Sequence, residues 1–298
     1  MTARRARLAA QAKVNLGLRV LDREPSGYHR LETLFARIDL ADELVIARTP
    51  TGCTLDLQGA DVGPTEQNLA YRAALAYLEA SGWSTGLAIA LTKRIPAGGG
   101  LGGGSADAGA VLRLLDAMAP TPMAPDRLAA IALRLGADVP FLATTAPQAL
   151  AWGRGERMTP VPTLPARDLL LCLPPFGVET KAAFGWLAES RTAGRLPAGG
   201  AAGDRPIDPG AVATWAAVRA WSRNDLEAPV EARHPELTAL RVGLRAAGAA
   251  LARMSGSGST VFGVFDVVLP AEIPAAPAGT RFVATRLVDE VARIELLD

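Results

Sequence analysis

The chain has 298 residues, 49% of them hydrophobic and 20% charged, which gives enough apolar material for one large or two ordinary packed domains and excludes an intrinsically disordered protein. Its 31 lysines and arginines against 30 aspartates and glutamates leave a net charge of +1, which gives no support for a nucleic-acid partner. Charges or prolines interrupt every apolar stretch before the roughly 20 residues that a membrane span needs, so we expect a soluble, cytoplasmic protein without a membrane partner.

Cysteine and histidine are too scarce to build a metal centre. Cys53 and Cys172 lie far apart without a Cys-x-x-Cys motif, so we expect two buried, unreactive thiols and neither a disulfide framework nor a zinc site. Only His29 and His234 are present, which excludes a histidine-rich metal site. Any chemistry must therefore rest on other residue types or on one of these two histidines.

Lysine is rare enough to mark candidate site residues. Lys13, Lys93 and Lys181 are the only lysines, and arginine supplies the other basic residues. Because a lysine ammonium is a compact charge on a flexible stem, lysine in an arginine-rich chain suggests a specific task. Retention by chance remains the alternative for any one of them.

The first half of the chain alternates between strand and helix patterns. Apolar residues at every second position predict strands over residues 12–21, 31–38, 42–48 and 87–92. Helical spacing predicts helices over residues 68–80, 105–118 and 126–135. We expect Ser105 to be the N-cap of the second helix and Gly136 to end the third.

The composition shifts after about residue 160. Residues 191–210 are rich in glycine, alanine and proline and lack periodicity, which predicts a long surface loop. Helices are expected over 212–221 and 235–247, a strand–turn–strand over 253–263 and a strand over 281–287. We therefore expect an α+β protein with one domain at residues 1–160 and a smaller one at residues 161–298.

A glycine-rich segment, residues 96–105, carries the strongest signal. It consists of Pro96, Ala97, Gly98, Gly99, Gly100, Leu101, Gly102, Gly103, Gly104 and Ser105. Glycines without Cβ let backbone N–H groups approach an anion closely, and the following helix directs its positive end at the same place. The segment therefore predicts a phosphate site. A flexible linker is the alternative, which the position between a strand and a capped helix disfavours.

Several known phosphate loops do not fit this segment. A Walker loop requires Gly-Lys, which is absent from the chain, as are the His-Arg-Asp and Asp-Phe-Gly signatures of protein kinases. Gly98, Gly100 and Gly103 satisfy the dinucleotide pattern, but in so glycine-dense a run the match is nearly automatic. In a dinucleotide-binding domain the loop follows its strand tightly, whereas here Lys93, Arg94 and then Pro96 separate the strand from the glycines, which disfavours a dehydrogenase.

Three motifs together resemble those of the GHMP kinases, the small-molecule kinases grouped with galactokinase, homoserine kinase, mevalonate kinase and phosphomevalonate kinase. They are residues 12–16 (AKVNL), 96–105 and 255–258 (SGSG). Residues 26–29 (SGYH) and 136–141 (GADVPF) are similar to the 4-diphosphocytidyl-2-C-methyl-D-erythritol kinase family within that group. The resemblance implies an N-terminal ribosomal-protein-S5-like nucleotide domain and a C-terminal ferredoxin-like domain.

The sequence departs from the family pattern at three places. Gln11 replaces a usual proline and Ser26 a usual acidic residue, and we expect both to change only turn rigidity. Asp107 stands where the family often has asparagine and brings a carboxylate into a phosphate-binding helix turn. That carboxylate either faces away from the phosphates or helps to hold Mg²⁺, and both alternatives stay open.

The resemblance implies an ATP- and Mg²⁺-dependent kinase that phosphorylates the 2-hydroxyl of 4-diphosphocytidyl-2-C-methyl-D-erythritol in the non-mevalonate pathway of isoprenoid synthesis. It places Asp138 beside the acceptor hydroxyl, as an orienting group and late proton acceptor, and Lys13 next to both Asp138 and the γ-phosphate. It also assigns Lys93 and Asn68 to the adenine pocket. The structural alternatives are a helix-terminal aspartate, a surface lysine and a helix N-cap.

The resemblance also implies an acceptor site. Asn15 is expected to bond the substrate or Lys13, Tyr28 to stack on the cytosine ring, and His29 to bond its polar edge. Phe184 and Thr180 are expected to face the substrate. Another GHMP kinase, of homoserine or mevalonate type, and a non-catalytic nucleotide-binding regulator remain the competing hypotheses. The sequence indicates neither the protein ligands of the metal nor an oligomeric state.

Overall fold

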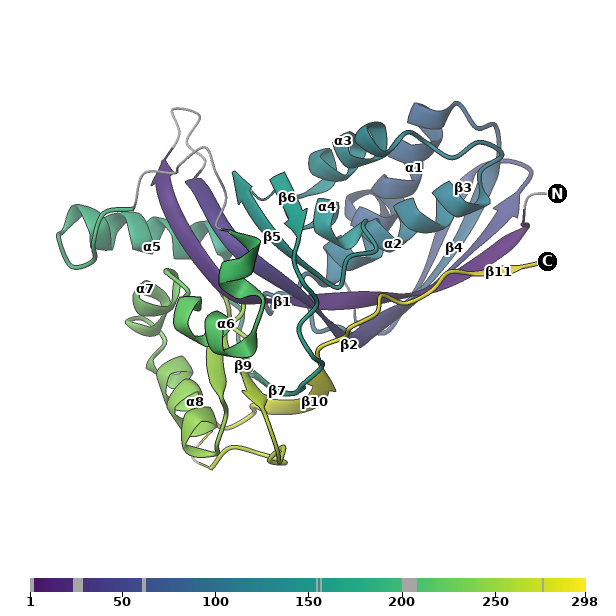
Figure 1. Cartoon of the computed structure of the whole chain (residues 1–298). Coiled ribbons are helices and arrows are strands. Elements are labelled where there is room, and N and C mark those ends of the chain that lie inside the picture. Colours follow the sequence, from purple (N-terminus) through teal and green to yellow (C-terminus); the bar gives the residue numbers. More distant parts are fainter. Residues whose placement is uncertain are drawn as a thin grey trace.

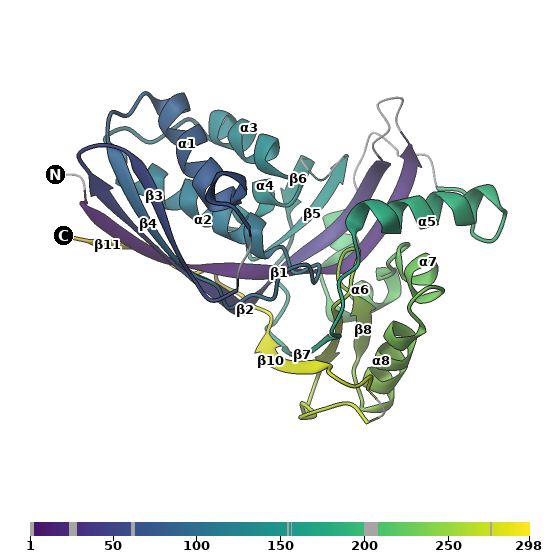
Figure 2. The ribbon, with the colours of Figure 1, turned by 180° about the vertical axis from the view of Figure 1, so that it is seen from behind.

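The computed structural model describes residues 3–23, 29–60, 63–153, 155, 157–199, 208–274 and 276–298. Across these residues the chain forms a seven-stranded sheet and a four-stranded sheet. Helices cover one face of the larger sheet, and the smaller sheet lies on the other side with its own helices (Figures 1 and 2). Within the described ranges no helix combines the length and apolar character needed to cross a membrane.

The larger sheet has the order β11-β1-β2-β4-β3, with β5 paired to β2 and β6 to β5. Its strands are β1 (Arg5–Arg23), β2 (His29–Thr49), β3 (Cys53–Gln58), β4 (Gly86–Thr92), β5 (Gln148–Gly153), β6 (Arg157–Pro160) and β11 (Glu295–Leu297). The helices on it are α1 (Leu69–Ser81), α2 (Gly103–Met118), α3 (Pro125–Leu135) and α4 (Val139–Leu142), and a 3₁₀ turn, η1 (Thr65–Gln67), precedes α1.

The smaller sheet has the order β10-β7-β9-β8. Its strands are β7 (Asp168–Leu173), β8 (Leu251–Met254), β9 (Val261–Phe265) and β10 (Arg281–Arg286). The helices of this part are α5 (Thr180–Thr192), α6 (Trp215–Trp221), α7 (Glu227–Glu231) and α8 (Pro235–Ala246), and η2 (Pro209–Val212) precedes α6. The last strand, β11, returns to the larger sheet and pairs with β1, so both chain ends lie side by side (Figure 1). The division at residue 160 stays a prediction.

Helix α2 lies at the centre of the larger core. Every residue from Ala106 to Leu112 is buried, because the alanine- and glycine-rich sequence lets β1, α1 and α4 approach closely on several sides. A Cβ on Gly109 would lie 2.5 Å from the carbonyl carbon of Leu142, so the glycine is needed where α2 crosses α4. This packing fixes the short helix α4, whose N-cap is Asp138, against α2.

Most predicted elements are confirmed, with local corrections. The strands predicted over 31–38 and 42–48 are one strand, β2, because it pairs with β1 on both sides of an irregularity at residues 38–40. Ser105 is not the N-cap of α2: Gly102, in a left-handed conformation, ends the loop early and caps the helix. Helix α6 begins at Trp215, after a cap by Thr214 and the turn η2. In the predicted loop over 191–210, Arg191 and Thr192 end α5, and residues 200–207 lie outside the described residues.

Candidate active site

The glycine loop, residues 96–105, connects β4 to α2. Gly98, Gly100 and Gly102 all adopt a positive φ, of 71°, 74° and 71°. A Cβ on Gly100 would lie 2.2 Å from the carbonyl oxygen of Ser255, so this position admits only glycine where the second sheet's connection approaches the loop. A positive φ at every second residue produces a concave run of backbone N–H groups, which favours anion binding.

Two cavities meet at this loop. The first, here called the loop cavity, has a volume of about 330 Å³ and is lined by the whole glycine loop together with Asn68, Lys93 and Asp107. The second, the Lys13 cavity, has a volume of about 260 Å³ and is lined by Lys13, Asn15, Asp138, Thr180 and Phe184, among others. Gly100, Gly102 and Ser105 line both. A ligand in each cavity could therefore present a reacting group at one shared wall.

A larger groove, of about 510 Å³, lies elsewhere on the larger sheet. Its lining includes exposed ion pairs of Arg7 with Glu295 and of Arg94 with Glu43. The sequence-predicted site residues line the two smaller cavities instead. We place the site there, because the glycine loop and the lysine–aspartate pair converge on them.

Lys13 and Asp138 are brought together although 125 positions separate them in the sequence. Lys13 Nζ lies 3.3 Å from Asp138 Oδ2, and the side chain of Lys13 is 4% exposed against 31% for Asp138. The backbone N–H of Lys13 donates to the carbonyl of Leu101, which ties β1 to the glycine loop. A buried ammonium thus holds a carboxylate that still reaches the Lys13 cavity.

A hydrogen-bonded chain orients this lysine. Lys13 Nζ donates to Asn15 Oδ1 at 2.7 Å, and Asn15 Nδ2 donates to Thr33 Oγ1 at 2.7 Å. The hydroxyl of Thr33 in turn donates to the carbonyl of Gly17, also at 2.7 Å. Asn15 therefore contacts Lys13, one of its two predicted partners. Sequence reasoning missed Thr33, whose only signal is a polar residue inside an apolar strand.

The second lysine at the loop, Lys93, lies in a sealed group of charges. Its side chain is 3% exposed, and its ammonium bonds Asp42 and, at 2.6 Å, Asp107 Oδ2. Asp42 Oδ1 also accepts from the backbone N–H groups of Arg94 and Ile95, at 2.8 Å for Ile95. Lys93 is therefore not a solvated surface charge. Asp42 was missed, because only the tertiary fold brings it to Lys93.

Asp107 faces Lys93. The pKa of its carboxyl is raised to about 7, chiefly by burial; the charge of Lys93 opposes this rise and that of Asp42 adds to it. Its Oδ1 atom is buried and has no hydrogen-bond partner among the described residues. Of the two alternatives for this carboxylate, the geometry favours the one in which it turns from the phosphate loop toward a cation of the protein.

Asn68 combines a structural contact with its place at the cavity. Its Oδ1 accepts from the backbone N–H of Ala70 at 2.9 Å, so it is the N-cap of α1. The helix-cap alternative is therefore correct for the side-chain oxygen, while the residue also lines the loop cavity.

Phe184 lines the Lys13 cavity, and a second aromatic ring stacks on it. The ring of His29 stacks on Phe184 with centroids 5.3 Å apart and planes 28° from parallel. Thr180, one helical turn before Phe184 on α5, shares a hydrogen bond of 3.0 Å with Ser257. Tyr28, predicted to stack on a base, lies outside the described residues. Phe184, expected to face the substrate, stacks on His29.

The connection between β8 and β9, residues 255–259, closes the site from the smaller sheet; we call it the Ser–Gly turn. The hydroxyl of Ser255 donates to the carbonyl of Gly100 at 2.8 Å. The backbone N–H of Thr260 donates to the carbonyl of Gly99 at 3.3 Å. The turn and the start of β9 thus lie against the glycine loop.

The remaining cysteines and histidine do not join the site. Both cysteines are free, and burial raises the pKa of Cys172 to about 12 and also raises that of the partly buried Cys53. Both thiols are therefore poor nucleophiles, although Cys53 is less buried than expected. His234 stacks on Phe176, with centroids 4.8 Å apart, within the smaller domain.

Comparisons with known proteins agree with this arrangement. The family models for the GHMP kinases N terminal domain and the GHMP kinases C terminal match residues 68–145 and 207–273. A 4-diphosphocytidyl-2-C-methyl-D-erythritol kinase of Solibacter usitatus is 41% identical over 265 residues, which cover 89% of this chain and 82% of that protein. One of Deinococcus radiodurans is 40% identical over 273 residues, covering 91% and 88% of the two chains.

Solved structures give the same picture. A crystal structure of 4-(cytidine 5'-diphospho)-2C-methyl-D-erythritol kinase is 38% identical, has a TM-score of 0.72, and is matched over 94% of this chain and 98% of that chain. A homoserine kinase from Cytophaga hutchinsonii, 16% identical with a TM-score of 0.67 over 98% of both chains, shares the fold. The predicted two-domain α+β fold is confirmed, and the chain belongs to the 4-diphosphocytidyl-2-C-methyl-D-erythritol kinase family of GHMP kinases.

Proposed function

We propose that the chain transfers the γ-phosphoryl group of ATP to the 2-hydroxyl of 4-diphosphocytidyl-2-C-methyl-D-erythritol, a step of non-mevalonate isoprenoid synthesis. The relatives at 40% and 41% identity bear the name of this kinase. The observation that carries the proposal is the shared wall of the two cavities, at which Lys13 and Asp138 face each other. A donor bound in the loop cavity and an acceptor bound in the Lys13 cavity would bring their reacting groups together at Gly100, Gly102 and Ser105, which line both cavities.

The loop cavity is the proposed nucleotide site. Membership in a kinase family implies the use of ATP. The glycine loop would hold the phosphates through its backbone N–H groups and through the N-terminus of α2, which together favour negative charge. Asn68 and Lys93 would form part of the wall beside the nucleoside.

Mg²⁺ fits this site as a companion of the nucleotide. The described residues contain no group of three or more histidine, cysteine, aspartate or glutamate side chains that could hold a metal ion. Mg²⁺ in kinases is usually held by substrate phosphates, waters and one or two protein oxygens, so such a group is not required. Ser105, which lines both cavities, would supply a protein oxygen. Bound there, the ion neutralises charge on the phosphates.

Lys13 and Asp138 would carry the chemistry of the acceptor. Asp138 orients the hydroxyl and accepts its proton as the phosphoryl group arrives, since an alcohol holds its proton too tightly to lose it beforehand. The ammonium of Lys13 stabilises the negative charge that spreads over the transferred group. Asn15 holds that ammonium in place through its side-chain carbonyl.

The part of the Lys13 cavity at Phe184 would receive the cytosine ring. Phe184 lines this cavity, His29 stacks on Phe184, and by resemblance Tyr28 joins them. Rings with polar edges suit a nucleobase, whereas homoserine and mevalonate have no base to stack. A cytoplasmic location and the lack of nucleic-acid and membrane partners remain predictions from the sequence.

An acceptor screen with radiolabelled ATP tests the function. We expect label to pass to 4-diphosphocytidyl-2-C-methyl-D-erythritol and to neither homoserine nor mevalonate. Comparable labelling of homoserine or mevalonate would favour a different small-alcohol kinase. ATP binding without labelling of any of the three would favour the regulator hypothesis.

A further inference from the structure

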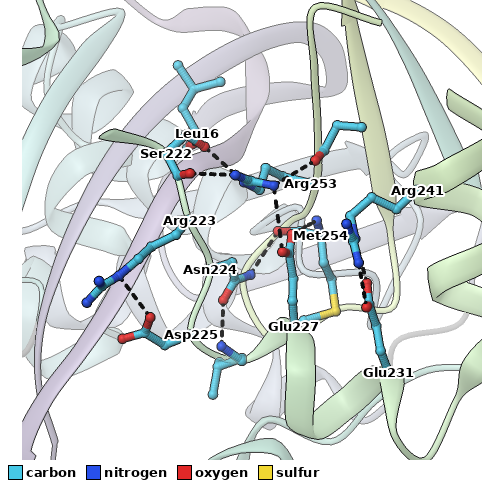
Figure 3. Close-up of polar contacts among 12 residues, drawn as sticks. Leu16, Ser222, Arg223, Asn224, Asp225, Glu227, Glu231, Arg241, Arg253 and Met254 are labelled. Atoms are coloured by element: carbon cyan, nitrogen blue, oxygen red, sulfur yellow. Dashed lines mark hydrogen bonds and ion pairs between the residues drawn. The ribbon is translucent and has the colours of Figure 1, made fainter. Parts of the chain in front are cut away.

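The segment between α6 and α7, residues 222–226, belongs to the smaller domain and forms hydrogen bonds with β1 of the larger sheet, beside the site. The backbone N–H of Leu18 donates to the carbonyl of Arg223 at 2.7 Å, and the N–H of Asp225 donates to the carbonyl of Leu18 at 2.9 Å. These bonds place the segment parallel to β1, a few residues beyond Lys13 and Asn15. Figure 3 shows Ser222 bonded to Leu16 of β1 and Asn224 bonded to Met254 of β8.

The side chain of Asn224 lies at the centre of this segment and uses its whole amide. Its Nδ2 donates to the carbonyl of Met254 at 2.9 Å (Figure 3). It also donates to the carbonyl of Gly256 at 2.7 Å, while its Oδ1 accepts from the N–H of Leu226 at 2.9 Å. Asn224 is 5% exposed. Because two carbonyls need donors and one N–H needs an acceptor, only a side chain with both functions satisfies all three.

The two carbonyls that Asn224 holds flank Ser255 of the Ser–Gly turn. Ser255 donates to the carbonyl of Gly100 and accepts, at 3.4 Å, from the N–H of Asn15. A Cβ on Gly256 would lie 3.5 Å from Lys13 Nζ, so this part of the turn faces the ammonium. Asn224 thus holds the turn by two hydrogen bonds on one side, while the other side of the turn contacts Gly100 and faces Lys13.

Leu226, the third partner of Asn224, lines the Lys13 cavity. Asn224 itself is not among the described residues that line either cavity. Its contacts reach the site only through backbone groups of the turn and of Leu226. Its influence on the reaction must therefore be indirect.

We propose that Asn224 is a positioning residue, which sets the Ser–Gly turn against the glycine loop and so fixes Lys13 and the shared wall for phosphoryl transfer. The kinetic part of this proposal rests on the proposed function. The structural part, the register between turn and loop, does not depend on which alcohol is phosphorylated.

The test begins with Asn224→Asp, which keeps the shape but turns an oxygen toward the carbonyls of Met254 and Gly256. We expect kcat to fall on the order of 10- to 100-fold, because small misplacements of reacting groups are that costly. The dissociation constant of ATP should change by less than about threefold, since this variant leaves the glycine loop's own N–H groups in place. The control is Glu231→Gln, which breaks the neighbouring ion pair with Arg241, 2.7 Å long, and should leave kcat unchanged.

A double-mutant cycle with Ser255→Ala separates positioning from general destabilisation. If Asn224 acts through the contact between Ser255 and Gly100, the double variant should be about as slow as Asn224→Asp alone. Losses that multiply would overturn the proposal, as would a normal kcat in the folded single variant. Should the aspartate variant fail to fold, Asn224→Ala, which lets water reach both carbonyls, takes its place in the same cycle.

Hydrogen exchange of the Thr260 amide gives a readout that needs no acceptor. This N–H bonds the carbonyl of Gly99 across the domains, and its exchange should accelerate at least about tenfold in the Asn224 variant but not in Glu231→Gln. Unchanged exchange would overturn the structural part of the proposal. Absence of phosphoryl transfer by the wild-type protein would contradict the proposed function and leave the exchange result to decide on Asn224.

Discussion

Two lysines stand near the glycine loop and both pair with aspartate, yet the two groups differ in what their carboxylates can reach. Beside Lys13, the carboxylate of Asp138 is 31% exposed and faces a cavity. Beside Lys93, the side chains of Asp42 and Asp107 are almost wholly enclosed. Asp107 borders the loop cavity, but its side chain is only 3% exposed, so it serves the protein's own cation, whereas the partly exposed Asp138 can meet an external hydroxyl. The same residue types therefore suit chemistry in the first group and support of the loop in the second.

Removing the ammonium of the enclosed group should have the largest effect on stability. Lys93→Met leaves Asp42 and Asp107 as two buried carboxylates without their cation, and breaking such a pair costs about 3–5 kcal/mol. Urea denaturation of the variant measures the loss. Arg94→Gln, at an exposed ion pair on the next residue, is the control and should cost under about 1 kcal/mol. Equal stability of the two variants would contradict a supporting role for Lys93.

The pair of Lys13 and Asp138 should show the opposite pattern, a large effect on turnover and a small one on stability. Asp138→Asn keeps the shape but removes the proton acceptor, so kcat should fall on the order of 100-fold or more. Stability and nucleotide affinity should change little, because this carboxylate is partly exposed and lies outside the loop cavity. Steady-state kinetics with a nucleotide-binding titration check both points. Turnover near the wild-type rate would remove Asp138 from the mechanism.

The accessible group also predicts a separate effect on acceptor binding. Phe184→Ala removes the ring that stacks on His29, and we expect KM for the cytidine alcohol to rise about tenfold through lost stacking. The KM for ATP should stay within about twofold, since Phe184 lines only the Lys13 cavity of the two. Equal increases for both substrates would mean that the base binds elsewhere.

The enclosed group predicts the smallest effect, a dependence of stability on pH. Because burial raises the pKa of Asp107 from 3.8 to about 7, the folded protein holds a proton that the unfolded chain releases between those values. The stability contributed by this proton is full below about pH 4 and is lost as the pH rises through about 7. Asp107→Asn should flatten that part of the curve. Asp39→Asn, at an exposed position, should not. Parallel curves for wild type and Asp107→Asn would contradict the assignment.

The sequence was most informative where one local segment forms the candidate phosphate site. The glycine loop, its preceding strand and its following helix were all predicted from composition and periodicity, and the loop indeed borders a cavity. The error at Ser105 arose because sequence preference for a serine cap competes with a left-handed glycine, and here Gly102 ends the loop first. The local sequence pattern predicts that a helix is present, but the predicted first residue can differ from the observed one by about a turn.

Contacts between distant segments were beyond local pattern. Asp42 meets Lys93 across 51 positions, and Asn224 meets Gly256 across 32. Periodicity carries no information on which polar residue of one strand will face another segment. The proximity of Lys13 and Asp138 was expected only because the motifs resemble a known family. Strand β11 was likewise missed, since its three residues form a strand only by pairing with β1.

A crystal structure with a non-hydrolysable ATP analogue and the cytidine alcohol tests the central claim most directly. We predict the terminal phosphate at Gly102 and Ser105, with the ammonium of Lys13 beside it and the 2-hydroxyl within hydrogen-bond distance of Asp138. A terminal phosphate bound away from this shared wall, or an acceptor hydroxyl that Asp138 does not reach, would contradict the account.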